Sequence, residues 1–113
     1  MAQALNRKAL VQMRMGDSKA AVRTAVRALK ASQGSQQKSL IAQSLFRLSE
    51  AQMRAWQSEA ALENGQKAIT LFQELGDKSG TGRAYWSVAC AYADLRRAEE
   101  SRLAAHTALK LCQ

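Results

Sequence analysis

The feature that most constrains the fold of this chain is a set of small residues that returns every 40 positions. Ala, Ser or Gly occupies four columns at this spacing, and a fifth column beside the last of them holds Leu or Ile. The columns are Ala9/Ser49/Ala89, Ala21/Ala61/Ser101, Ala25/Gly65/Ala105, Ala28/Ala68/Ala108 and Leu29/Ile69/Leu109. A constant interval of this length indicates stacked repeats, in which each unit buries its apolar face against the next.

Each repeat is predicted to contain two helices. Residues that favour helix dominate, and the chain has no proline and 6 glycines, so strands with tight turns are not expected. Ala21, Ala25 and Ala28 are spaced i, i+4, i+7 and lie on one helical face, where a neighbouring backbone could approach closely. The predicted helices cover residues 2–15, 18–32, 36–54, 57–75, 79–94 and 98–112. The expected fold class is all-α, with six helices in three antiparallel pairs.

The predicted turns carry residues that end one helix and cap the next. Glycine suits the left-handed end of a helix, and an Asp or Ser side chain can cap the helix that follows. The sequence offers such residues at Gly16-Asp17, at Gly34, at Ser58 and at Gly76-Asp77. Trp56 stands at a predicted turn, either as a corner residue folded onto its neighbours or as an exposed contact residue. The turn at 95–97 has no glycine and is inferred from the period.

The third unit carries Tyr85, Val88, Ala89 and Tyr92, followed by the small residues of its second helix. This pattern resembles the tetratricopeptide repeat. The segment 71–80 resembles the linker of a subclass with a 40-residue period, familiar from kinesin light chain, spindle-orientation adaptors and sensory regions of bacterial regulators. The resemblance covers nearly the whole chain. It implies a right-handed α-solenoid, a single domain of residues 1–113 with repeats at about 2–35, 42–75 and 82–113. The departures from the family pattern are Lys8, Gln12, Gln52 and Trp56.

In that family the first helices of successive pairs line a concave groove that holds a peptide or a partner helix. Here Arg7 recurs 40 residues later as Arg47, and the pair Met13-Arg14 recurs as Met53-Arg54. Arginine binds carboxylates bidentately, and Met and aromatic side chains act as anchors, so an acidic partner with apolar residues is expected. The alternative makes these residues ordinary solvated and packing side chains. The expected groove residues are Asn6, Arg7, Met13, Arg14, Phe46, Arg47, Glu50, Met53, Arg54, Arg83, Trp86, Ser87, Cys90 and Asp94.

The formal net charge of +8 is concentrated near the start of the chain, where residues 1–38 hold eight Lys or Arg against Asp17 alone. Lys19, Arg23, Arg27 and Lys30 are spaced along one predicted helix, either as a solvated face or as a surface for nucleic acid or an anionic membrane. No aromatic residues or reading motif accompany them, so a solvated face is favoured and nucleic acid is not an expected partner. The chain stops inside its last predicted helix without a capping helix. We therefore expect a fragment of a longer protein, with possible homo-oligomer contacts through that helix. A second interpretation is a structural or oligomerising regulatory segment of a larger bacterial signalling or transcription protein.

Catalysis, cofactors and bound metals are not expected. His106 is the single histidine, and no metal-ligand spacing or phosphate-binding glycine loop is present. Cys90 and Cys112 are too few for a disulfide framework, which favours a cytoplasmic protein with reduced thiols. No apolar run is long enough to cross a membrane. The sequence therefore predicts a cytoplasmic protein-binding scaffold.

Overall fold

The computed structural model describes residues 2–111, and over this range it contains six α-helices and no strand. The helices are α1 (Ala2–Arg14), α2 (Ser18–Ser35), α3 (Lys38–Arg54), α4 (Ser58–Glu74), α5 (Lys78–Asp94) and α6 (Ala98–Leu111). The all-α fold class is confirmed. Cys112 and the predicted end of the last helix lie outside the described residues.

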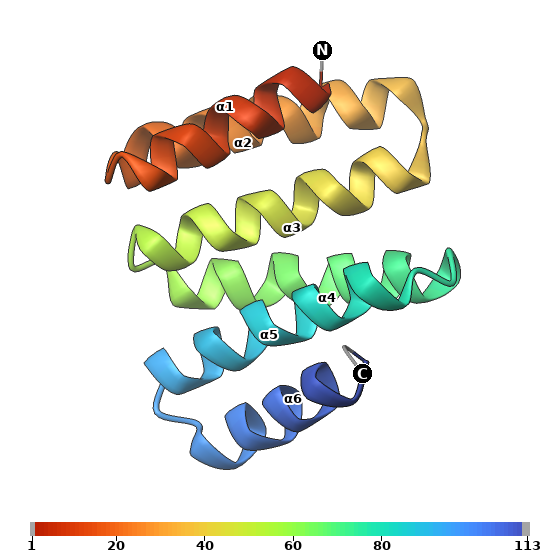
Figure 1. Ribbon diagram of the computed structural model, residues 1–113. Helices are drawn as coiled ribbons and strands as arrows, with labels where there is room; N and C mark the ends of the chain where they lie inside the picture. The colour runs from red at the N-terminus through yellow and green to blue at the C-terminus, as the bar shows by residue number, and fades with distance from the viewer. Residues whose placement is uncertain (1, 112–113) are drawn as a thin grey trace.

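The helices form three antiparallel pairs that stack side by side (Figure 1). The first helices of the pairs are in contact, α1 with α3 and α3 with α5, and each second helix also packs against the next first helix, α2 on α3 and α4 on α5. The turns at 15–17, 55–57 and 95–97 lie along one edge, and those at 36–37 and 75–77 lie along the other (Figure 1). This arrangement is a helical-repeat solenoid, as the period predicted.

The small residues mark the places where helices approach most closely. Ala28 and Ala68 have no exposed surface and Ala108 has 2%, so this column is buried in all three repeats. Two other columns meet within a helix pair. The Ser49 hydroxyl donates to the Ala61 carbonyl over 2.7 Å, and the Ser101 hydroxyl donates to the Ala89 carbonyl over 2.8 Å. The same contact is therefore made in the second and third repeats, with the hydroxyl on opposite helices.

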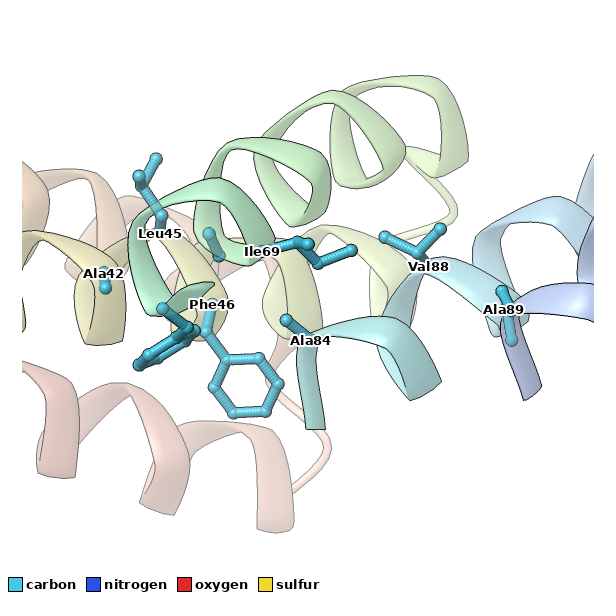
Figure 2. Close-up of a cluster of buried hydrophobic side chains, with 10 residues drawn as sticks. Ala42, Leu45, Phe46, Ile69, Ala84, Val88 and Ala89 are labelled. Atoms are coloured by element: carbon cyan, nitrogen blue, oxygen red, sulfur yellow. The ribbon is translucent and has the colours of Figure 1, made fainter. Parts of the chain in front are cut away.

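The main core lies between α3, α4 and α5 (Figure 2). Phe46, Ile69 and Val88 are each at most 8% exposed there, and Ile69 and Val88 lie next to one another between α4 and α5. A second cluster joins the first repeat to α3 and consists mainly of alanines with Met13 and Leu48. The first repeat is therefore held by closely packed small side chains, and the second and third by larger ones.

Left-handed residues end the helices at the same 40-residue interval. Gly16, Trp56 and Arg96 have φ of 83°, 64° and 61°, and Gln36 and Gly76 have φ of 60° and 69°. At Gly16 the backbone N–H bonds to the Met13 carbonyl, and the next N–H bonds to the carbonyl five residues back; the same pair of bonds recurs at Trp56, Gly76 and Arg96. This is the Schellman arrangement, and it confirms the turn that was inferred at 95–97 from the period alone.

Two predicted helix ends are wrong. Gly34 lies inside α2, which continues to Ser35, and Gln36 takes the left-handed position instead. The hydroxyls of Ser32 and Ser35 donate to carbonyls three residues back, which satisfies acceptors in this last part of the helix. Ser58 begins α4 and does not cap it; its hydroxyl donates to Asp94. The cap predicted at Asp17 is confirmed, since its side chain accepts a backbone N–H three residues on. The predicted turn at Gly76-Asp77 is also present, and the Asp77 side chain caps α5 in the same way.

Candidate functional site

A pocket of about 570 Å³ opens between α3, α5 and α6. It lies where Trp86 projects from α5, with residues of α3 and of the end of α6 around it. Its lining residues are Phe46, Glu50, Met53, Arg54, Gly82, Arg83, Trp86, Ser87, Cys90, Ala108 and Leu109. Eight of the fourteen residues predicted from the sequence are among them.

Three lining residues were missed, namely Gly82, Ala108 and Leu109. The prediction drew the groove from the first helices alone, and α6 is a second helix. In the column of Leu29, Ile69 and Leu109, Ile69 is 8% exposed but Leu109 is 59% exposed. Among the described residues α6 packs against α5 alone, so Leu109 is left uncovered and lines the pocket. The repeat column alone suggests that Leu109 is covered as Ile69 is, so the period gave no signal for this lining residue.

The apolar part of the pocket combines a fixed and an accessible aromatic ring. Phe46 is 8% exposed and belongs to the main core, which holds its ring in place. Trp86 is 54% exposed on the next first helix, and the half-buried Met53 lies on the α3 side. An exposed tryptophan and a buried aromatic ring that line the same pocket provide a large apolar contact area, which suits an anchoring site.

The charges around this pocket are unbalanced. Glu50 is partly buried, and its carboxylate accepts a 2.6 Å ion-paired hydrogen bond from Arg47 on the same helix. The Arg47 guanidinium also lies over the Phe46 ring, 5.5 Å from its centroid. Arg54 and Arg83 are exposed on the pocket rim and have no ion-pair partner within residues 2–111. The acidic residue is thus neutralised internally, and two cations remain available to a ligand.

Ser87 and Cys90 complete the α5 side of the pocket. Ser87 is 7% exposed, and its hydroxyl lies 3.0 Å from that of Ser49, which fixes it to α3. Burial, and to a smaller extent the negative charge of Asp94, raises the pKa of the Cys90 thiol. Cys90 is therefore a neutral thiol at physiological pH and not a reactive thiolate.

The other predicted groove residues do not line this pocket. Met13 is 2% exposed and packs in the first-repeat core, so it is not available as an anchor, because neighbouring alanines leave space that its flexible side chain fills. Asn6 is 7% exposed and donates to Ser44, and it lines a smaller pocket of about 270 Å³ together with Arg47. Arg7 and Arg14 are exposed on α1.

The remaining predicted residue, Asp94, accepts a hydrogen bond from Ser58 and lines a separate hollow beside Trp56. Trp56 itself is 83% exposed. The interpretation of Trp56 as a corner residue folded onto its neighbours is therefore wrong, and its ring is available for contact.

Within residues 2–111 no three His, Cys, Asp or Glu side chains gather closely enough to hold a metal ion. Over the same stretch, no helix has the length and apolar character required to span a membrane.

The stacked pairs and the left-handed helix ends together define a tetratricopeptide-like helical-repeat fold. The comparison with solved structures agrees. The tetratricopeptide-repeat domain of Arabidopsis FLU superimposes with a TM-score of 0.88 over 96% of this chain and 92% of that chain, at 16% sequence identity. Comparison with protein-family models finds no match, and neither does comparison with curated proteins. At this identity the likeness establishes the fold.

Proposed function

We propose that this chain is a protein-interaction domain whose pocket between α3, α5 and α6 binds a partner segment that carries both an apolar side chain and a carboxylate. The observation that carries this proposal is a single pocket lined by the exposed Trp86, the buried Phe46 and two arginines without an ion-pair partner among the described residues, Arg54 and Arg83. The apolar side chain of the partner would pack on Trp86, and its carboxylate would reach an arginine on the rim.

The tetratricopeptide-like fold supports a scaffold role at a general level. The finer assignment to the subclass with a 40-residue period also belongs to this proposal, and it is supported by the recurrence of the left-handed residues at 16, 56 and 96. The pocket extends over the second and third repeats, so a bound segment would lie mainly on α3 and α5 and against the end of α6. Of the arginines expected to recur between the first two repeats, only Arg54 lines this pocket, and Arg83 of α5 joins it.

The test uses a fluorescein-labelled peptide of twelve residues with a central Phe flanked by Asp and Glu, and a second peptide with Lys in place of the acidic residues. Binding is measured by fluorescence anisotropy. Trp86→Ala should weaken binding of the acidic peptide by at least about tenfold, because a central aromatic anchor commonly supplies this much. A double variant that carries Arg54→Glu and Arg83→Glu should bind the acidic peptide no better than the peptide with Lys.

Trp56→Ala is the matched control, because it removes an equally large exposed ring outside the pocket. Charge reversal at Arg47 is less informative, since Arg47 is held by Glu50 and its loss would leave that carboxylate unpaired. If Trp86→Ala and Trp56→Ala weaken binding equally, or if neither does, the pocket is not the binding site.

A further inference from the structure

The solvent face of α2 is a continuous row of cations. Lys19, Arg23, Arg27 and Lys30 are all exposed. With about 100° between successive residues of a helix, the four side chains fall within an arc of roughly 80°, on the side opposite the buried alanines of α2. At 1.5 Å per residue the row is about 16 Å long. It is a straight and rigid feature because α2 packs against both α1 and α3.

The fold does not require these cations. The positions 40 and 80 residues later lie on the second helices of the other two pairs. In α4 they are Glu59, Glu63, Lys67 and Thr70, and in α6 they are Glu99, Leu103, Thr107 and Lys110. The formal charge of the row is thus +4 on α2, −1 on α4 and 0 on α6. Equivalent surface positions in the same molecule accept acidic and neutral residues, so the row is a local property of the first repeat.

The row also lowers the folding stability of the chain when no partner is bound. Cations four residues apart on a helix repel each other, and Lys19 lies in the first turn of α2, near the positive end of the helix dipole. The first turns of α4 and α6 hold acidic residues, and that of α2 holds none. In the part of the chain that the structure describes, the five ion pairs involve residues from Lys38 onward, and none of the seven Lys and Arg of α1 and α2 takes part.

We propose that this row binds the phosphate backbone of double-stranded nucleic acid without reading its bases. Four cations at intervals of about 6 Å can contact several phosphates at once. A helix that lies on a membrane buries large apolar side chains beside its basic residues, and α2 exposes none among the described residues. Single strands are held by stacking on aromatic rings, and α2 contains no aromatic residue. The remaining polyanion with regularly spaced charges is a duplex.

The first experiment measures binding of the full chain to a fluorescein-labelled DNA duplex of 24 base pairs over a series of salt concentrations. Four phosphate contacts predict that the logarithm of the binding constant falls against the logarithm of the salt concentration with a slope of about −3.6. A duplex of unrelated sequence should bind equally well. A slope no steeper than about −1, or a strong preference for one sequence, would overturn the proposal.

The decisive variant transfers the α4 residues to α2 as Lys19→Glu, Arg23→Glu, Arg27→Lys and Lys30→Thr, which lowers the net charge by five. Its matched control lowers the charge equally elsewhere, with Lys67→Glu, Arg102→Glu and Lys110→Thr. The transfer should weaken duplex binding by at least about tenfold and flatten the salt slope, and the control should change binding much less. The melting temperature of the transfer variant should be unchanged or higher, because the repulsion within α2 is relieved.

Equal losses of duplex affinity in the transfer variant and the control would show that binding depends on net charge alone. That result would overturn the assignment to α2. A further measurement tests binding of the chain to vesicles that contain phosphatidylserine. Binding to these vesicles that is tighter than binding to the duplex, and that is lost in the transfer variant, would reassign the row to a membrane and refute the proposal.

Discussion

Replacing Gly65 by alanine tests whether close approach between helices holds this fold together. Gly65 lies in the middle of α4, in a column whose other members are alanines. A methyl group at Gly65 would lie 2.7 Å from Val88 Cγ2 and 3.2 Å from Ser49 Oγ. Ordinary carbon contacts are about 3.5–4.0 Å, so α5 or Val88 would have to move by roughly 1 Å.

Neither neighbour can move freely. Val88 is 3% exposed and branched at Cβ, and Ser49 is fixed by its hydrogen bonds to Ala61 and Ser87. Overpacking of this kind lowers the free energy of unfolding by about 1–3 kcal/mol. The higher helix propensity of alanine raises it by about 1 kcal/mol relative to glycine in a helix interior. The difference is about 0–2 kcal/mol, and we expect Gly65→Ala to lower the free energy of unfolding by about 1 kcal/mol. For a chain of this size, that corresponds to a fall in melting temperature of roughly 4–8 °C.

Gly34→Ala is the matched control, because Gly34 is also helical and a methyl group there would have nothing within 4 Å. We expect it to stabilise the protein by about 0.5 kcal/mol, since the position is near the helix end. Both changes are measured by urea denaturation followed by circular dichroism. In the Gly65→Ala background, Val88→Ala should cost less than it does in the unchanged chain, because it removes the clash. If Gly65→Ala stabilises the protein as Gly34→Ala does, the close-approach argument is refuted.

Two further predictions concern single side chains. Trp56→Gly should raise the free energy of unfolding by about 1 kcal/mol, because the backbone of Trp56 is in the left-handed conformation and its side chain is 83% exposed. Trp56→Ala should not give this gain, because alanine keeps the cost of the left-handed backbone. Equal effects of the two variants in urea denaturation would contradict this prediction. In a Cys112→Ser background, alkylation of Cys90 by iodoacetamide should follow a pKa above that of an ordinary thiol, since burial and Asp94 both raise it. Asp94→Asn should lower that pKa and speed alkylation at pH 8; an unchanged pH profile would contradict the role of Asp94.

The architecture could be predicted because it depends on residues that repeat. The columns of small side chains identify contacts that recur in each unit, and Asp17 and Asp77 cap helices through local geometry alone. Gly34 misled the prediction, because a glycine near a helix end does not by itself terminate the helix. The hydroxyls of Ser32 and Ser35 supply acceptor partners there, and Gln36 accepts the left-handed conformation at a modest cost.

The site was less predictable because burial depends on neighbours that the period does not describe. Met13 and Met53 occupy the same column, yet Met13 fills the space beside alanines and Met53 lines the pocket. The pairing of Arg47 with Glu50, three residues on, was visible as a local helix pattern. It could have been used to separate the neutralised arginine from Arg54. Leu109 shares a column with the buried Ile69, and the column cannot show that Leu109 is exposed in this structure.

The proposed pocket and the proposed cationic row share no residue and lie on different helices. The pocket belongs to α3, α5 and α6, and the row belongs to α2. Within residues 2–111, α1 and α2 contact the rest of the molecule through α3 and do not touch α5 or α6. In a repeat stack each unit interacts only with its neighbours. A structural change on the outer face of α2 would therefore affect Trp86 only through α3. Two anionic ligands, an acidic segment in the pocket and a phosphate backbone on α2, would therefore be compatible on one chain, because each would be held by its own set of cations.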